Sequence, residues 1–277
     1  MRSSRRMESI DQHFVVSGGR IRFRDEGKGG PVVFLHGWTL DLEMWQPQVI
    51  ALCRQFRIIR FDRRGFGLST GTPDPVQDVE DFRSLVDHLQ LAQVAVVGMS
   101  QGARLAIRVA LSMPQCVSAL VLDGPPNLVA ADSAGADENL AIDVYRELVR
   151  ARGVQAFRQI WLQHPFTELQ TTDIRARELL SQMIARYPGH DLKGPEPSAS
   201  HAIDASTLSQ LRKPVLVING AKDSDSRRRA GEELRQALPI AWRALIPNAG
   251  HLANLDNPEF YNDVLSGFLL RQARIAA

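Results

Sequence analysis

Short runs of apolar residues recur along the chain and predict β-strands that are buried on both faces. They lie at residues 31–35, 57–61, 94–97, 117–122, 214–218 and 242–246. Strands of this kind belong in a parallel sheet, because helices must cover each of its sides. Near the N-terminus, apolar and polar residues alternate on either side of Ser17-Gly18-Gly19, which instead predicts an antiparallel hairpin with a glycine turn.

Helical periodicity separates these runs, with apolar residues returning every three or four positions as on the buried face of an amphipathic helix. The clearest such segments are 76–89, 101–113, 227–238 and 258–271. Strands that alternate with helices through right-handed crossovers predict a doubly wound α/β fold.

One long stretch breaks this alternation. Residues 127–206 contain helix-like segments at 139–152, 154–162 and 172–187, no convincing strand, and a loop-like end at 188–197. We therefore predict an α/β core formed by residues 1–126 and 207–277, with residues 127–206 inserted as a helical cap, or lid, over the sheet.

Composition and charge narrow the function classes. Of the 277 residues, 44% are hydrophobic and 23% are charged, which is typical of a packed globular protein. The net charge of +2 gives no bulk attraction to nucleic acid or to a membrane, so neither is expected as a partner. Cys53 and Cys116 are isolated and predict neither a disulfide nor a zinc site. No apolar run has signal-peptide or membrane-spanning length, so we expect a cytoplasmic protein that works alone or as a homodimer.

The segment Gly98-Met99-Ser100-Gln101-Gly102 directly follows one predicted strand and directly precedes a predicted helix. This setting is what the G-x-S-x-G nucleophile elbow requires. Side chains at the glycine positions would collide in so tight a turn, and the serine itself is held in a strained conformation. We therefore predict that Ser100 is a nucleophile at the carboxyl edge of the sheet.

A serine nucleophile needs a histidine base and an acid that orients the base. His251 lies in a loop between the last predicted strand and the final helix, and Asp223 follows another predicted strand. Both therefore reach the same sheet edge as Ser100, in the chain order that the α/β-hydrolase fold imposes. Asp123 and Asp225 remain alternative acids, since one ends the preceding core strand and the other lies two residues beyond Asp223.

Acyl transfer also needs backbone N–H donors for the oxyanion. One is the N–H of Gln101, the residue after the nucleophile, and the second is expected from the loop His36-Gly37-Trp38-Thr39. A glycine lets this backbone come close to the substrate, and the Trp38 N–H would point inward. We therefore predict an oxyanion hole formed by Trp38 and Gln101.

Taken together, these motifs resemble those of the α/β-hydrolase superfamily over residues 31–270. The resemblance extends to Asp62-Arg63-Arg64-Gly65-Phe66-Gly67-Leu68-Ser69 and to Asn219-Gly220-Ala221-Lys222-Asp223. The N-terminal half, notably Met44-Trp45-Gln46-Pro47-Gln48, is similar to 3-oxoadipate enol-lactonases and small carboxylesterases. These likenesses imply the fold and the triad, and they leave the reaction open.

Part of the chain also resembles the menaquinone-pathway SHCHC synthase, which uses the same triad to eliminate pyruvate. In that family an arginine follows the serine by four residues, as Arg104 does here, and a lid tryptophan occurs in a context like that of Trp161. The chain departs from the family at Met99, where the synthase usually has tyrosine, and at Ala103, which replaces its second glycine.

Three residues are candidates for substrate binding. Arg104 could hold a substrate carboxylate, or it could form a structural ion pair with Asp62 or Asp123. Trp161 and Phe166 could line an acyl pocket, or they could bury the apolar face of the lid against the core.

These features predict a serine hydrolase that cleaves a small-molecule carboxylic ester or lactone through an acyl-enzyme, without a metal or an organic cofactor. The alternatives are a lyase or carbon–carbon hydrolase acting on an acidic metabolite, a cofactor-free haloperoxidase or perhydrolase, and a ligand-binding protein with a vestigial triad. The run Arg227-Arg228-Arg229 is expected on a solvated helix face.

Overall fold

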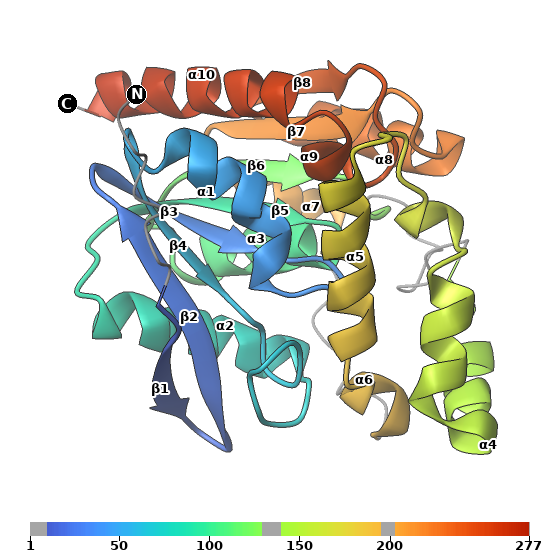
Figure 1. Cartoon of the computed structure of the whole chain (residues 1–277). Helices are drawn as coiled ribbons and strands as arrows, with labels where there is room; N and C mark the ends of the chain where they lie inside the picture. The colour runs from blue at the N-terminus through green and yellow to red at the C-terminus, as the bar shows by residue number, and fades with distance from the viewer. Residues whose placement is uncertain (1–9, 129–139, 195–202, 277) are drawn as a thin grey trace, which may run out of the picture.

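The computed structural model describes residues 10–128, 140–194 and 203–276. Its centre is a sheet of eight strands in the order β1-β2-β4-β3-β5-β6-β7-β8 (Figure 1). The β1–β2 and β2–β4 pairs are antiparallel and the later pairs are parallel, which confirms the predicted hairpin and parallel sheet. The strands are β1 (Gln12–Val16), β2 (Gly19–Gly27), β3 (Gly30–Leu35), β4 (Phe56–Phe61), β5 (Val94–Met99), β6 (Val117–Asp123), β7 (Val215–Gly220) and β8 (Ala241–Ile246).

Alternate residues of the central strands pack into opposite layers. In β3, Val32 and Phe34 join the apolar cluster that contains α1 and α10, whereas Val33 and Leu35 join the one that contains α2, α3 and α8. Helices on both faces explain the unbroken apolar runs. The helices of these layers are α1 (Gln46–Leu52), α2 (Pro75–His88), α3 (Gln101–Ser112), α8 (Asp225–Ala237) and α10 (Pro258–Ala276), with shorter η1 (Leu42–Trp45), α7 (Ala205–Ser209) and α9 (Ala253–Asp256).

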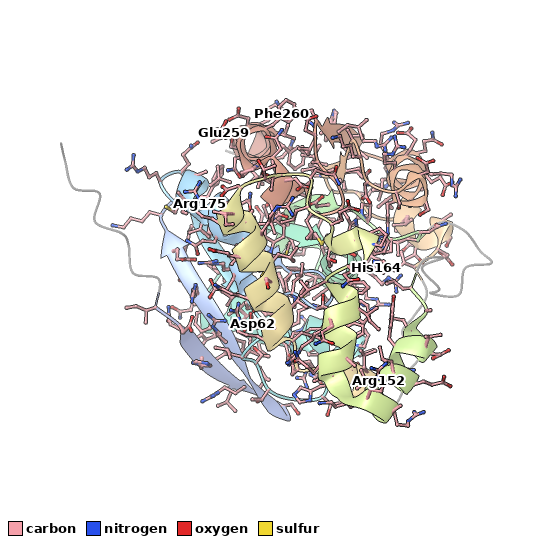
Figure 2. The ribbon with its side chains drawn as sticks, turned by 45° about the vertical axis from the view of Figure 1, so that its right-hand side comes forward. Asp62, Arg152, His164, Arg175, Glu259 and Phe260 are labelled. Carbon is pink, nitrogen blue, oxygen red and sulfur yellow. The ribbon has the colours of Figure 1, made fainter. Side chains whose placement is uncertain are left out.

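The described residues between β6 and β7 include a group of helices, and residues 140–194 are called the lid below. They comprise α4 (Ile142–Trp161), η2 (Pro165–Thr167), α5 (Ile174–Arg186) and α6 (His190–Lys193). Helices α4 and α5 lie beside each other near the carboxyl ends of the parallel strands, and the exposed Arg152 and Arg175 mark them in Figure 2.

The lid matches the sequence prediction within α4 and departs from it near residue 190. Helix α4 is broken at Gly153, whose φ of 77° separates the two helices that the sequence predicted. Helix α6 instead forms inside residues 188–197, which were predicted to be a loop, and the left-handed Gly189 directly precedes it. Residues 129–139 and 195–202 lie outside the described residues, so the predicted boundaries of the lid stay predictions.

Among the described helices, none is both long and apolar enough to cross a membrane.

Candidate active site

Ser100 lies in a sharp turn between β5 and α3. Its φ of 52° and ψ of −112° place it in a strained backbone region that costs about 1–3 kcal/mol. The flanking glycines are required by contact: a Cβ on Gly98 would lie 2.2 Å from the Gly102 carbonyl oxygen, and one on Gly102 would lie 2.4 Å from that of Leu35. The Ser100 N–H also donates to the Asp123 carbonyl at 2.8 Å, which fixes the turn to β6.

His251 and Asp223 meet at the same edge of the sheet, as their positions after β8 and β7 predict. His251 Nδ1 lies 3.0 Å from Asp223 Oδ2, and both side chains are buried. The Ser224 N–H donates to the other carboxylate oxygen, Oδ1, at 2.8 Å and so helps to orient it. When Nδ1 donates to Asp223, Nε2 is the acceptor that faces a nucleophile.

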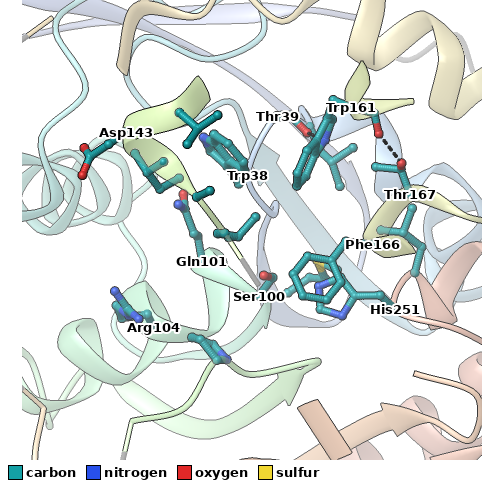
Figure 3. Close-up of a pocket in the computed structure, with 18 residues that line it drawn as sticks. Trp38, Thr39, Ser100, Gln101, Arg104, Asp143, Trp161, Phe166, Thr167 and His251 are labelled. Atoms are coloured by element: carbon teal, nitrogen blue, oxygen red, sulfur yellow. Dashed lines mark hydrogen bonds between the residues drawn. The ribbon is translucent and has the colours of Figure 1, made fainter. Parts of the chain in front are cut away.

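Ser100 and His251 line one cavity, and Figure 3 shows both among its lining side chains. Within the described part of the chain, no hydrogen bond joins the Ser100 hydroxyl to His251. Contacts between a nucleophile and its base are often long before substrate binds and shorten in the complex.

The two alternative acids lie elsewhere. Asp225 is exposed on α8 and pairs with Arg228. Asp123 is fully buried at the end of β6, where burial and the nearby charge of Asp223 raise its pKa well above the usual value. Neither acid forms a hydrogen bond or ion pair with His251 in the described structure, so the geometry favours Asp223.

The loop that carries Trp38 is shaped by His36, which is fully buried. Its Nδ1 donates to the Gly37 carbonyl at 2.8 Å, and its Nε2 accepts from the Arg63 N–H at 2.9 Å. Burial lowers the pKa of His36 well below 6.5, so the ring stays neutral and keeps these two roles. Among the described residues, the Trp38 and Gln101 N–H groups donate to no protein acceptor, as an oxyanion hole requires.

The cavity has a volume of about 490 Å³ and is mostly apolar. Its lining includes Trp38, Trp161 and Phe166, and the centre of the Phe166 ring lies 4.5 Å from the centre of the His251 ring. The Trp161 indole N–H donates to Thr39 Oγ1 at 2.7 Å, so the lid forms part of the cavity wall (Figure 3). Both apolar lid candidates therefore lie beside the predicted chemistry.

Arg104 also lines this cavity, at the opposite end from His251 in Figure 3. Neither acid that the sequence offered pairs with it: Asp62 pairs with Arg22 at 3.3 Å, and Asp123 makes no ion pair with a described residue. Within the described chain no carboxylate lies within 4.0 Å of the Arg104 guanidinium, and burial lowers the pKa of that group. The geometry leaves this cation available to a ligand.

Arg227 contradicts the expectation of a solvated helix face. Its side chain is buried, with its guanidinium 4.6 Å from the centre of the Phe166 ring and Nη1 donating to the Gly124 carbonyl at 3.3 Å. Burial, together with the charge of Arg104, lowers its pKa to about 9. The signal was present in the sequence, because Arg227 lies three and seven positions before the apolar residues Ala230 and Leu234 on the buried face of α8.

The described residues contain no group of three or more His, Cys, Asp or Glu side chains that could hold a metal ion. The site instead offers a hydroxyl, an imidazole that is bonded to a carboxylate, and two free backbone N–H groups. These are the components of nucleophilic acyl transfer.

Comparison with known proteins agrees with this architecture. The chain is 26% identical to the 2-hydroxy-6-oxo-6-(2'-aminophenyl)hexa-2,4-dienoic acid hydrolase of Metapseudomonas resinovorans, over 95% of this chain and 92% of that protein. It is 28% identical to a Bacillus subtilis protein assigned as 2-succinyl-6-hydroxy-2,4-cyclohexadiene-1-carboxylate synthase, over 92% and 96% of the two chains.

Among solved structures, a thermophilic esterase from Thermogutta terrifontis superimposes with a TM-score of 0.80 at 26% identity, covering 96% of this chain and 99% of the esterase. The family model described as "alpha/beta hydrolase fold" matches residues 30–258, which confirms the resemblance drawn from the sequence. With most of its length matched, the chain belongs to the α/β-hydrolase fold family, whose relatives here include hydrolases.

Proposed function

We propose that the protein is a serine hydrolase that cleaves a carboxylic ester or a lactone. Ser100 attacks the carbonyl carbon while His251 takes its proton, and Asp223 holds the imidazole and stabilises its positive charge. The Trp38 and Gln101 N–H groups bind the oxyanion. His251 then gives this proton to the alkoxide oxygen as the ester C–O bond breaks, so the alcohol leaves, or stays on the acyl chain of a lactone, and Ser100 is acylated. Water attacks the acyl-enzyme with His251 as the base, His251 returns the proton to Ser100, and the acid leaves.

One observation carries this proposal. Ser100, strained at φ 52°, shares a cavity with His251, and His251 Nδ1 lies 3.0 Å from Asp223 Oδ2. The likeness to the T. terrifontis esterase supports the same reaction class.

The test is hydrolysis of p-nitrophenyl butyrate, with a burst of nitrophenol and labelling by a fluorophosphonate located by mass spectrometry. Ser100→Ala removes both the turnover and the label, whereas Ser112→Ala, at the exposed last serine of α3, keeps both. Turnover by Ser100→Ala at the parent rate overturns the proposal, as does an unlabelled parent protein.

A second candidate is a reaction on an acidic substrate, by a carbon–carbon hydrolase or a lyase that uses the same triad. Arg104 in the cavity favours it, because this half-buried cation has no counter-ion among the described residues, which is costly, and a substrate carboxylate would neutralise it. Both sequence relatives described above are named for substrates or products that are carboxylic acids.

This candidate is tested by comparing p-nitrophenyl butyrate with mono-p-nitrophenyl succinate, which carries a free carboxylate. Arg104→Gln should lower kcat/KM for the acidic ester about 10- to 100-fold, as expected for a charge-assisted hydrogen bond, and leave the neutral ester within about twofold. Arg228→Gln, on the partly exposed side of α8, is the matched control. An equal loss on both esters assigns Arg104 to structure instead.

A further inference from the structure

The lid binds the side chain of the residue that we propose as an oxyanion donor. The Trp38 indole N–H donates to Asp191 Oδ2 of α6 at 2.6 Å. The Tyr187 hydroxyl donates to Oδ1 of the same carboxylate, and burial beside that negative charge raises the pKa of Tyr187 well above 10, so it remains a donor. Arg158 of α4 in turn donates twice to the Tyr187 carbonyl, at 2.9 and 2.6 Å, and so holds the backbone that leads into α6.

Two further lid helices bind the same loop, residues 36–41, which we call the oxyanion loop. Trp161 at the end of α4 donates its indole N–H to Thr39 Oγ1 at 2.7 Å. Arg186 at the end of α5 donates to Asp41 Oδ2 through Nη2 at 2.8 Å and Nε at 3.1 Å. Helices α4, α5 and α6 therefore each bind a different side chain of one short loop.

The middle of the oxyanion loop has an unusual backbone conformation. Thr39 has a φ of 64°, a left-handed conformation that a β-branched residue rarely adopts. The lid surrounds the Trp38 ring with aromatic side chains, whose ring centres lie 4.7 Å away for Trp161 and 5.6 Å away for Phe157. The Trp38 side chain is held at its indole N–H and packed by these rings, so the backbone of Trp38 has little freedom to rotate. The direction of the Trp38 backbone N–H therefore depends on lid contacts.

We propose that Asp191 is a positioning residue for the oxyanion hole, holding Trp38 so that its backbone N–H points at the developing oxyanion. Arg186 supports the same loop through Asp41. This inference rests on the proposed function, and it makes the docked lid a condition for transition-state stabilisation as well as a wall of the cavity. A misplacement of about 1 Å in such a site can cost about 100-fold in rate.

The experiment uses p-nitrophenyl butyrate and its thiono analogue, in which sulfur replaces the carbonyl oxygen. Sulfur is larger and accepts hydrogen bonds weakly, so the ratio of kcat/KM for the ester to that for the thionoester reports on the oxyanion donors. Asp191→Ala should lower kcat for the oxygen ester about 10- to 100-fold, change KM less than about threefold, and lower the ratio about tenfold. Asp191→Asn keeps an acceptor oxygen and should restore most of the ratio.

Glu178→Ala is the matched control, because it removes one carboxylate from the exposed face of α5 in the same lid. Arg186→Gln, at a side chain that is 35% exposed, should lower the ratio without unfolding the protein. It is therefore the second test variant if Asp191→Ala folds poorly. An unfolded fraction of the protein lowers the measured turnover of both substrates by the same factor and leaves the ratio unchanged.

The inference is overturned if the Asp191 and Arg186 variants keep the parent ratio, whether or not turnover falls. Failure of the proposed function has a different result: the parent protein then hydrolyses neither substrate, or Ser100→Ala hydrolyses them equally well.

Discussion

Replacing Asp223 by asparagine tests which acid serves the histidine. The substitution keeps the size of the side chain and removes the charge beside His251 Nδ1, 3.0 Å away in a buried setting. We treat the delocalised charges of the ring and the carboxylate as two unit charges about 4 Å apart. At an effective dielectric constant of about 20 their attraction is about 4 kcal/mol. Because about 1.4 kcal/mol corresponds to a tenfold rate change, this predicts a loss of about 10³-fold in kcat.

The assay is steady-state hydrolysis of p-nitrophenyl butyrate at neutral pH, with kcat and KM determined separately. We expect the loss in kcat and a KM within about threefold of the parent, since Asp223 does not line the cavity. Asp225→Asn is the control, because that exposed acid two residues away should leave both parameters unchanged.

A loss of less than tenfold would refute the reasoning, since another group would then supply the charge. Buried Asp123 is the candidate, and an additional loss in an Asp223→Asn, Asp123→Asn double variant, measured against Asp223→Asn alone, would identify it.

Three further predictions concern stability, each measured by urea unfolding. Gly102→Ala should destabilise by several kcal/mol, because its Cβ would overlap a backbone oxygen, whereas Gly30→Ala, which meets nothing within 4 Å, should cost less than about 1 kcal/mol. Phe166→Leu should cost about 1–2 kcal/mol by removing the ring packed against His251 and a buried guanidinium; an unchanged midpoint would contradict this. Burial raises the pKa of Asp78 from 3.8 to about 6. The folded state therefore holds a proton that the unfolded state has lost, so stability should fall as pH rises from about 4 to about 6, and Asp78→Asn should flatten that decline.

The parallel sheet and the elbow could be predicted because their signals are local. The strands β3, β5 and β7 carry apolar runs, whereas β8 at the sheet edge leaves Trp242 and Leu245 about half exposed. The two glycines around Ser100 are required by backbone contacts that any elbow of this shape makes. The meeting of His251 with Asp223 also followed from topology, since the carboxyl ends of neighbouring parallel strands share one edge.

What the sequence did not predict depends on contacts between distant segments. The Trp38–Asp191 hydrogen bond joins residues 153 positions apart, and no periodicity encodes such a pairing. The sequence does not predict helix α6, because this helix is a single turn within a segment rich in Pro and Gly. The charge of Arg227 predicts an exposed side chain, whereas the helical period places this residue on the buried face of α8.

The aromatic contact between lid and core gives the protein a built-in optical signal. The chain has four tryptophans, and two of them, Trp38 on the core and Trp161 on the lid, meet edge to face with ring centres 4.7 Å apart. Both indole N–H groups are hydrogen-bonded across this boundary. Separation of the lid would break both bonds and expose both rings to water, so the intrinsic fluorescence would record each opening and closing without an added dye.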